Sequence, residues 1–580
     1  MGRALRAAAA GLLFVLPLTL TAPVGAADTS TIELTIAGSP TSALDSTPIS
    51  IDSTLYLPST TPAPSVVLAH GFGGSKASTA EQARQLQDAG FVVLTYSARG
   101  FGKTIGTISM NSPQFEVADA RALIDYLAQR KEVIKDSAND PRVGFAGGSY
   151  GGAISLLVAG YDNRVDAVSS DITWNDMQQA LFAQNVVGDT TTPGVFKQMW
   201  ASYFFSVGMA TPPNLVSPCG RFSLNWCAAY QQWVTRGLLS PDAAALLRAS
   251  SPASITNKIT APTLIMAGQA DSLFPLSEAS TTFTQIHSAH PDTPLKLVWH
   301  AAGHDGGVNE TERLQALTLT WFKKYLADAA VDTGPVFEAT LASGSVVSNS
   351  SRNQLKFFTT NNFSGVRGNS TQSIKLTGKP QSVVAPAGGQ PGLITVLPGL
   401  GGSLASLVGR AFPNQSAYFR TRPLDATTPL IGASTVKVRL TSQQNAPEAV
   451  LFISLRIING QSTQRFPNGL VAPVRLANLV AGQPVDIEVQ LPVIVAEASV
   501  GEYLQLVVST TDAAYRMPVE PAVYTVELVD NQLSLPVMDV TKVSTQSSPL
   551  TAVWTAIGVV LLVILVLWLR RPRRRPAEFR

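Results

Sequence analysis

The sequence predicts an α/β domain with a doubly wound parallel sheet, interrupted by a helical cap and followed by a β-sandwich and one transmembrane helix. Short apolar runs alternate with helix-like segments over residues 28–171 and again over residues 258–332. Strand-like runs fill residues 333–535, and an uncharged apolar run covers residues 551–569. Alternating strands and helices are typical of a parallel sheet covered on both faces, whereas strands alone indicate a sandwich.

The first residues have the parts of a secretory signal peptide. Arg3 and Arg6 give a positive start, residues 7–20 are almost wholly apolar, and small residues at 24–27 offer a cleavage site. An uncleaved anchor helix is less favoured, because the apolar run is short and Pro17 interrupts it. We therefore assign residues 1–27 to a signal peptide and expect the protein to be exported.

The other end of the chain predicts a membrane anchor. Residues 551–569 are numerous enough to cross the hydrocarbon core as a helix. A polar stalk at 536–550 precedes them, and a basic tail at 570–580 follows; a buried core helix would hardly end in such a tail. Cationic residues stay on the cytoplasmic side. The sequence thus predicts a single-pass protein of the cell membrane, with its folded domains outside and its tail in the cytoplasm.

Charge excludes one class of partner. The two ends carry the excess of basic residues, and the rest of the chain has slightly more acidic than basic residues. A mildly acidic body lacks the basic patch that binds nucleic acid, so we expect no nucleic-acid partner.

Apolar runs bounded by turn residues predict the strands of the α/β domain. They lie at residues 66–69, 91–95, 143–146, 167–169, 263–267 and 295–299, after two alternating runs at 32–36 and 49–52. Helix-like segments lie at residues 81–89, 114–129 and 310–326, and the last of them ends the domain. Beyond residue 334, alternating runs at 354–359, 435–440, 450–457, 485–491 and 504–509 predict the sandwich.

The insertion at residues 172–257 predicts a helical cap. Its many aromatic residues, taken singly, more often pack a cap against its body than bind a ligand. A cap at this point would cover the carboxyl edge of the sheet, where such folds bind ligands.

The insertion also holds the only two cysteines, Cys219 and Cys227. In an exported chain this close pair predicts a structural disulfide rather than a metal site, which would need further ligands.

One glycine-rich segment carries the chemistry. Ser149 is the centre of a G-x-S-x-G motif between the apolar run at 143–146 and a helical stretch at 153–159. This strand–turn–helix context indicates the nucleophile elbow of the α/β-hydrolase fold. A serine hydroxyl needs a base within hydrogen-bond reach to attack at neutral pH. We predict Ser149 as the nucleophile.

The base and the acid follow from chain order. His304 lies in a glycine-rich loop just past the last predicted strand, and Asp271 lies in the loop after the preceding strand. The order Ser, Asp, His is the one that this fold uses. His300 is the competing base, although its place at the end of a strand favours a structural role. We predict Ser149, Asp271 and His304 as the catalytic triad, with no metal and no cofactor.

An acyl-transfer enzyme also needs donors for the oxyanion. His70-Gly71-Phe72-Gly73-Gly74 follows the strand at 66–69, where the first donor loop belongs. The backbone N–H groups of Phe72 and Tyr150 are the predicted pair, and His70 is interpreted as a residue that braces the loop.

With these residues identified, the chain resembles the X-Pro dipeptidyl-peptidase and cocaine-esterase-like (CocE/NonD) serine hydrolases over about residues 45–530. The elbow at 148–152, the R-G-x-G segment at 99–104 with the Glu116 and Asp119 helix, and the segments at 482–491 and 501–509 carry the resemblance. It implies a C-terminal jelly-roll domain and hydrolysis of a small ester or short peptide through an acyl-enzyme. Ser97 and Phe72 depart from the family pattern, in which an aspartate and often a tyrosine stand. Without a tyrosine hydroxyl at Phe72, ester hydrolysis is favoured over peptidase activity.

Two other functions compete with this interpretation. A lipase or esterase for larger apolar esters would suit the aromatic cap, and a non-catalytic surface-binding scaffold would leave the triad unused. An exopeptidase would need an acid for the amino terminus of its substrate, and Asp171 and Asp176 are both candidates.

Overall fold

The computed structural model describes residues 30–189, 191–210, 217–342, 355–392, 395, 412, 414–459, 464–465 and 467–544. The predicted signal peptide at 1–27, the transmembrane helix at 551–569, the basic tail and the end of the stalk lie outside these residues. Among the helices of the described part of the chain, none is long and apolar enough to cross a membrane.

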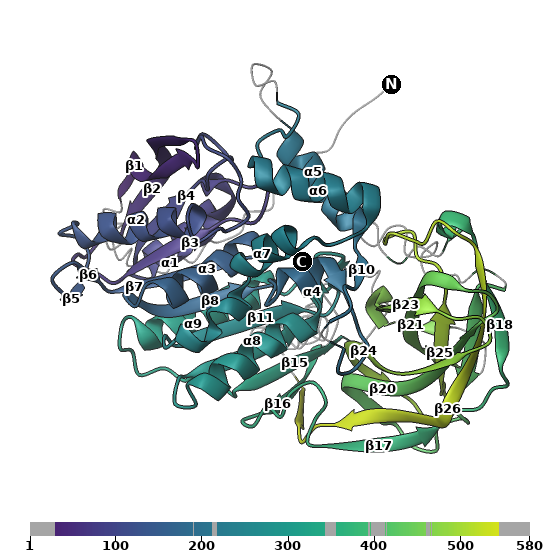
Figure 1. Cartoon of the computed structure of the whole chain (residues 1–580). Helices are drawn as coiled ribbons and strands as arrows, with labels where there is room; N and C mark the ends of the chain where they lie inside the picture. The colour runs from purple at the N-terminus through teal and green to yellow at the C-terminus, as the bar shows by residue number, and fades with distance from the viewer. Residues whose placement is uncertain are drawn as a thin grey trace, which may run out of the picture.

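A large mixed sheet forms the centre of the α/β domain (Figure 1). Its described strands, in spatial order, are β1 (Ser30–Ser42), β2 (Asp45–Leu57), β4 (Val92–Tyr96), β3 (Ser65–Ala69), β7 (Val143–Gly148), β8 (Val165–Asp171), β11 (Thr263–Gly268), β12 (Leu295–His300), β15 (Phe337–Ala342), β16 (Leu355–Thr360) and β27 (Thr541–Ser544). From β4 to β15 neighbouring strands run parallel, so their carboxyl ends share one edge. Loops that follow these strands therefore meet at that edge.

Helices cover both faces of the sheet, as the alternation predicts. One face packs against α2 (Glu116–Ala128), α3 (Tyr150–Tyr161) and α8 (Leu276–Ala289), and the other against α1 (Ala80–Asp88) and α9 (Thr311–Tyr325). The inner strands are buried along their length because both of their faces meet helices. This burial explains why the inner strands read as apolar runs rather than as alternating ones.

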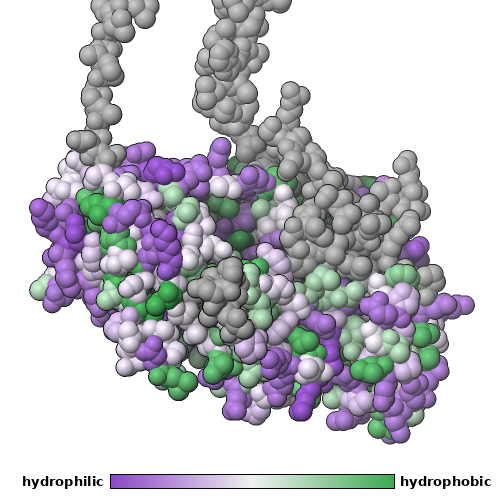
Figure 2. Space-filling model, turned by 90° about the horizontal axis from the view of Figure 1, so that it is seen from above, coloured by the Kyte–Doolittle hydropathy of each residue, from purple (hydrophilic) through white to green (hydrophobic). Residues whose placement is uncertain are grey.

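The cap is helical, and its helices α5 and α6 lie at the top of the view in Figure 1. It consists of α4 (Met177–Leu181), α5 (Gln198–Met209), α6 (Leu224–Arg236) and α7 (Pro241–Ala249), with the short strands β9 (Phe182–Ala183) and β10 (Val195–Phe196). Several of its aromatic side chains are buried and join the main core, so these residues do pack the cap against the body. In the view from above, hydrophilic and hydrophobic residues are interspersed over the described surface (Figure 2).

The C-terminal domain is β-rich, with two antiparallel sheets on a common core. One sheet contains β17 (Ser370–Lys375), β18 (Gln381–Ala385), β20 (Thr428–Ser442), β24 (Pro484–Ala498) and β26 (Ala522–Val537). The other contains β19 (Ser416–Arg420), β21 (Ala446–Ile458), β22 (Gln464–Arg465), β23 (Ala472–Leu479) and β25 (Tyr503–Ser509). Alternate residues are buried along β18, much of β24 and the ends of β26, as expected for strands with one face on a core. In contrast, β21 and β25 are buried along almost their whole length.

Three strands lie elsewhere than the sequence predicts. The first is β15, which falls within the range 333–535 assigned to the sandwich but pairs with β12 in the large sheet. The run at 354–359, interpreted as a sandwich strand, forms β16 and pairs with β15 in the large sheet. Residues within the predicted stalk form β27, which pairs with β16. The interpretation of 354–359 was therefore wrong, because an alternating pattern predicts a strand but does not specify its pairing partner. The chain thus returns from the sandwich to the large sheet before the described part ends.

Candidate active site

Ser149 sits in a strained turn between β7 and α3. Its φ of 55° and ψ of −119° lie outside the regions that serine normally adopts. The neighbouring glycines permit this turn, because a Cβ at Gly147 would lie 2.6 Å from the backbone of Gly151. A Cβ at Gly151 would lie 2.2 Å from the carbonyl oxygen of Ala69 on β3. The motif thus needs glycine because the elbow packs directly on backbone.

The structure brings Ser149, His304 and Asp271 together in a chain of hydrogen bonds. His304 Nε2 lies 2.9 Å from Ser149 Oγ, and His304 Nδ1 lies 2.6 Å from Asp271 Oδ2. The carboxylate of Asp271 accepts a hydrogen bond from the N–H at Nδ1, which leaves Nε2 unprotonated and able to take the serine proton. All three side chains come from loops at the carboxyl edge of the parallel strands.

The surroundings of Asp271 fix its orientation. The side chain is fully buried, and the N–H of Phe274 donates to Asp271 Oδ1 at 2.7 Å, which leaves Oδ2 for His304. Burial by itself would lower the pKa of His304, but the charge and hydrogen bond of Asp271 outweigh it and raise that pKa. The imidazolium that forms during attack is therefore stabilised.

A further acid, Asp305, lies beside the triad and was not singled out in the sequence. Burial, with the nearby charge of Asp271, raises the pKa of Asp305 to about 6. Its Oδ2 accepts the N–H of Ser272 at 2.6 Å. Asp305 thus connects the loop that carries His304 to the loop that carries Asp271, which we call the acid loop. In the sequence, only its position next to His304 could have indicated this role.

The other two candidate histidines have different partners. His300 Nε2 lies 3.0 Å from Asp171 Oδ1, so this imidazole does not reach the serine. His70 accepts the N–H of Ala98 at Nε2 and donates from Nδ1 to the oxygen of Gly71, at 2.9 and 2.8 Å. Burial lowers the pKa of His70. A neutral imidazole that holds two loops together fits the bracing role.

The first oxyanion loop lies against the nucleophile. A Cβ at Gly71 would be 3.9 Å from Ser149 Cβ, so the turn that contains Phe72 borders the serine. Tyr150 is the first residue of α3, where backbone N–H groups have no acceptor within the helix. Both predicted donors therefore belong to segments that flank Ser149, and the helix N-terminus favours negative charge there.

Aromatic side chains surround the histidine. The rings of Trp200 and Phe274 meet His304 edge-on, with centroids 5.9 and 5.4 Å away. From the same cap helix as Trp200, Phe204 lies 5.2 Å from the ring of Phe72. The cap thus gives the site an aromatic wall that spans from the base to the oxyanion loop.

The segment that resembles the R-G-x-G motif braces α2. Arg99 is buried and donates to both carboxylate oxygens of Asp119, at 2.7 and 2.9 Å. Glu116 accepts the N–H of Ser109 at 2.6 Å, and burial raises the pKa of Glu116 to about 7. Asn111, in the same loop, donates from Nδ2 to the carbonyl oxygen of Tyr150 at 2.9 Å. Through Asn111, this network holds the backbone of the residue that follows Ser149.

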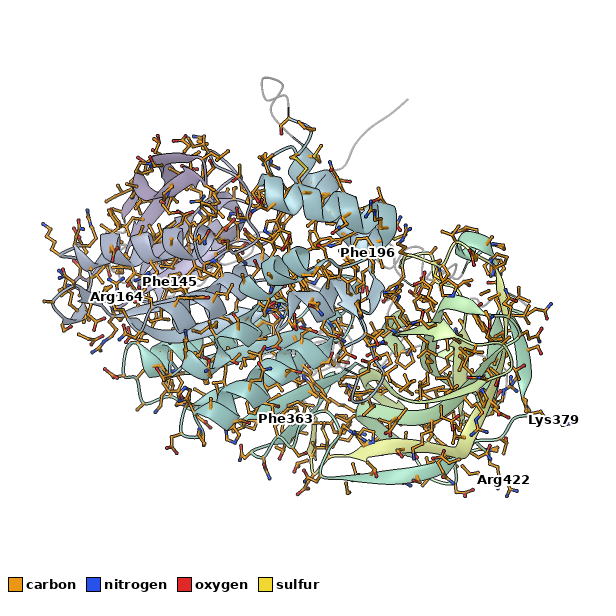
Figure 3. The ribbon with its side chains drawn as sticks, in the orientation of Figure 1. Phe145, Arg164, Phe196, Phe363, Lys379 and Arg422 are labelled. Atoms are coloured by element: carbon orange, nitrogen blue, oxygen red, sulfur yellow. A yellow bond between two sulfur atoms is a disulfide. The ribbon has the colours of Figure 1, made fainter. Side chains whose placement is uncertain are left out.

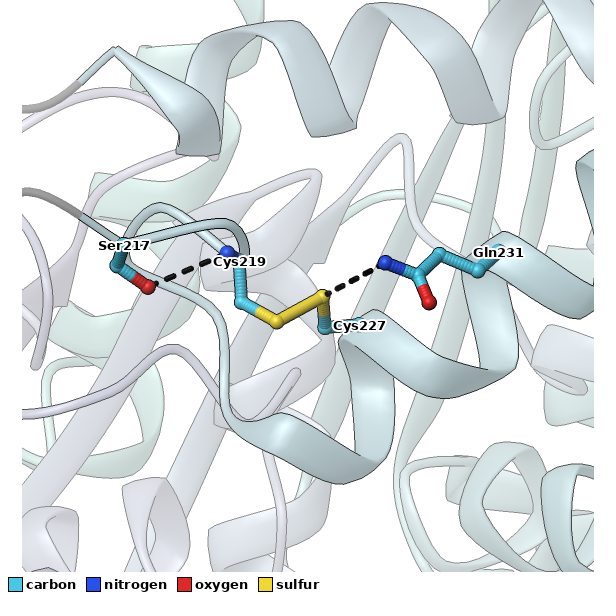
Figure 4. The surroundings of a disulfide bond; sticks show 4 residues. All are labelled: Ser217, Cys219, Cys227 and Gln231. Atoms are coloured by element: carbon cyan, nitrogen blue, oxygen red, sulfur yellow. Dashed lines mark hydrogen bonds between the residues drawn. A yellow bond between two sulfur atoms is a disulfide. The ribbon is translucent and has the colours of Figure 1, made fainter.

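Cys219 and Cys227 form a disulfide that joins the start of α6 to the preceding loop (Figure 4). Their Cα atoms lie 5.5 Å apart. The N–H of Cys219 donates to Ser217 Oγ at 3.2 Å. In the described part of the chain, no group of three or more potential metal ligands gathers.

Two family models match the chain in the order of its domains. The first, X-Pro dipeptidyl-peptidase (S15 family), matches residues 45–306, and the second, X-Pro dipeptidyl-peptidase C-terminal non-catalytic domain, matches residues 407–533. A CocE/NonD family hydrolase from Staphylococcus aureus is similar in structure, with a TM-score of 0.60 at 14% identity over 90% of this chain and 99% of that one. An α-amino acid ester hydrolase has a TM-score of 0.61 at 13% identity over 91% of this chain and 100% of that one.

Two curated relatives match parts of the chain. An uncharacterised 31.7 kDa protein of the traX-finO intergenic region in Escherichia coli is 30% identical over 114 residues, which is 20% of this chain and 38% of that protein. The quorum-quenching protein AidA of Acinetobacter baumannii is 29% identical over 277 residues, which is 45% of this chain and 86% of that protein. The solved structures share the fold of this chain. The two family models together cover more than half of the chain, so it belongs to the X-Pro dipeptidyl-peptidase (S15) family and is a serine hydrolase of the dipeptidyl-peptidase or esterase type.

Proposed function

We propose that this protein is an extracellular, membrane-anchored serine hydrolase that cleaves small apolar esters through an acyl-enzyme. The observation that carries the chemistry is the hydrogen-bonded chain from Ser149 through His304 to the buried carboxylate of Asp271. The observation that favours an apolar ester is the aromatic wall that borders this chain.

The proposed reaction has two halves. His304 Nε2 takes the proton of Ser149 Oγ as the oxygen attacks the ester carbonyl, and the N–H groups of Phe72 and Tyr150 bind the oxyanion. The intermediate collapses when His304 returns that proton to the leaving alcohol. Water then attacks the acyl-enzyme with His304 again as base, and Ser149 is released with its proton.

Two candidate acids for a substrate's amino terminus are already engaged. Asp171 binds His300, and Asp176 caps α4 by accepting the N–H of Gln178 at 2.8 Å. The second candidate function, release of X-Pro dipeptides, is favoured by the two family models. We favour the ester because both candidate acids are already engaged, and because the rings of Trp200 and Phe274 border His304.

The location outside the membrane is proposed from the sequence. Residues 1–27 resemble a signal peptide, and residues 551–569 with the arginines after them resemble a cytoplasmically flanked anchor. The disulfide supports this location, because such bonds persist in oxidising compartments.

A fluorophosphonate probe and a substrate panel test the proposal. The probe forms a covalent adduct with an activated serine, and we expect it to label the wild type at Ser149. Ser149→Ala should abolish labelling, whereas Ser155→Ala, which changes a buried serine farther along α3, should keep it. p-Nitrophenyl esters should be cleaved faster than Ala-Pro and Gly-Pro p-nitroanilides. A folded wild type that is not labelled would favour the scaffold, and preferred anilide cleavage would favour the dipeptidyl-peptidase.

A further inference from the structure

Lys197 is a buried lysine of the cap. It directly precedes α5 and is 4% exposed. Its Nζ donates to the carbonyl oxygens of Ser272 and Leu273, at 2.6 and 3.0 Å. These two residues follow Asp271 in the chain, so the ammonium holds the loop that carries the acid. A buried ammonium costs free energy unless it is well paired, so its bonds to these two carbonyl oxygens offset part of that cost.

The sandwich fixes the backbone on both sides of this lysine. The oxygen of Phe196 accepts the N–H of Arg516 at 2.9 Å, and the N–H of Met199 donates to the oxygen of Ala514 at 3.0 Å. Phe196 lies where the cap meets the sandwich (Figure 3). The short segment around Lys197 is therefore clamped by one sandwich loop, and its side chain extends from that clamp to the acid loop.

Two further hydrogen bonds hold the acid loop at Ser272. Trp200, one turn along α5, donates from its indole N–H to Ser272 Oγ at 3.0 Å. The N–H of Ser272 donates to Asp305, as described above. Lys197 supplies positive charge among the carboxylates of Asp271, Asp305 and Glu278.

The charged surroundings of Lys197 come from every element packed against it. Asp271 and Asp305 belong to the catalytic loops, and Glu278 belongs to α8. Tyr515 of the sandwich loop lines, with Lys197 and Glu278, a cavity of about 50 Å³. Burial lowers the pKa of Lys197 to about 8, against the effect of the acids, and burial also raises the pKa of Glu278 to about 7.

We propose that Lys197 is a positioning residue for the catalytic acid. Its ammonium, held in place by the sandwich, fixes the loop after Asp271 so that Oδ2 faces His304, and it balances the carboxylates around that histidine. This inference rests on the proposed roles of Asp271 and His304. It gives the sandwich a part in the reaction, because the clamp on Phe196 and Met199 reaches the triad through one side chain.

Lys197→Met and Lys197→Arg test this role. We expect Lys197→Met to lower kcat at least about tenfold with KM within about twofold, because misplacement of a catalytic group affects the chemical step. Its acid limb of activity should move to higher pH, since loss of the cation leaves more uncompensated negative charge around His304 and favours the imidazolium. Lys197→Arg retains the charge and should keep the limb in place.

A matched control is Lys296→Met. Lys296 is also buried, but its Nζ binds Glu338 and the oxygen of Pro335 on the far side of β12 from the acid loop. This variant should lose thermal stability without a shift of the acid limb. If Lys197→Met does not fold, Lys197→Gln keeps an N–H donor group without the charge and should show the same shift.

Two results would overturn the inference. One is a folded Lys197→Met or Lys197→Gln with the kcat and pH profile of the wild type. The other is a Lys197→Met that loses kcat but keeps the acid limb of the wild type, together with an equal loss of kcat in Lys197→Arg. That combination would indicate that Lys197 contributes packing alone. Absence of fluorophosphonate labelling in the wild type would instead refute the proposed function itself, so the two failures can be distinguished.

Discussion

The carboxylate of Asp171 binds His300, with Oδ1 3.0 Å from Nε2. The backbone of the same aspartate supports the elbow, because its carbonyl oxygen accepts the N–H of Ser149 at 2.9 Å. Two His–Asp pairs thus lie at one edge of the sheet, and the pair of His304 and Asp271 is the one that contacts Ser149. The charge of Asp171 outweighs the effect of burial and raises the pKa of His300.

We expect this second pair to be structural. His300→Gln should keep labelling of Ser149 by a fluorophosphonate and should lower the free energy of unfolding, because Asp171 would lose a charged partner. Labelling and denaturant unfolding measure the two effects. If His300→Gln abolished labelling in a folded protein while His304→Gln did not, the assignment of the base would be wrong.

The triad variants should differ in severity. Ser149→Ala and His304→Ala should each lower kcat by on the order of 10⁴ or more, because the triad acts as a unit. Asp271→Asn should be somewhat less severe, since the imidazole remains without its orienting anion. Steady-state rates on the best p-nitrophenyl ester give the comparison. Equal activity of Asp271→Asn and the wild type would exclude Asp271 as the acid.

The pH dependence follows from the raised pKa of His304. Attack needs the neutral imidazole, so activity should fall as the pH drops through this raised pKa, above the ordinary value of 6.5. Asp271→Asn removes the main group that raises it and should move the acid limb of kcat/KM to lower pH. A limb that does not move in Asp271→Asn would contradict the electrostatic role of this carboxylate.

The disulfide should be present in the exported protein. Mass spectrometry without reduction should detect linked peptides that carry Cys219 and Cys227. Cys227→Ser should lower the free energy of unfolding by about 2.5 kcal/mol or less, the chain-entropy value for so short a loop, and should keep ester hydrolysis. Free thiols at both positions in protein taken from the cell surface would refute the bridge.

The predicted topology can be tested on intact cells. Protease added outside should release an active fragment that begins near residue 27 and ends after Ser544, because Thr541–Ser544 is protected by its pairing with β16. Immunoblotting with antibodies to the sandwich and to the tail follows the two products. Activity that resists protease until the cells are lysed would place the catalytic domain on the other side of the membrane.

Part of this architecture could be predicted, because buried strands and tight backbone turns require particular residue types within short stretches of the sequence. The inner strands are buried on both faces, and they appear in the sequence as apolar runs. The elbow requires glycine on both sides of Ser149, and the loops that carry Asp271 and His304 follow successive strands. These requirements act within a few residues, so the sequence alone identified three side chains that the structure brings together.

Only the tertiary structure decided the contacts between distant segments. The same local pattern fits His300 and His304, and which one reaches the serine depends on where the strand ends relative to the elbow. Pairing of β16 with β15, and of β27 with β16, depends on which sheet edge is open. Lys197 has no motif; its role arises because a sandwich loop, a cap helix and the acid loop meet there. Such contacts depend on how layers pack, and no pattern of a few residues encodes that packing.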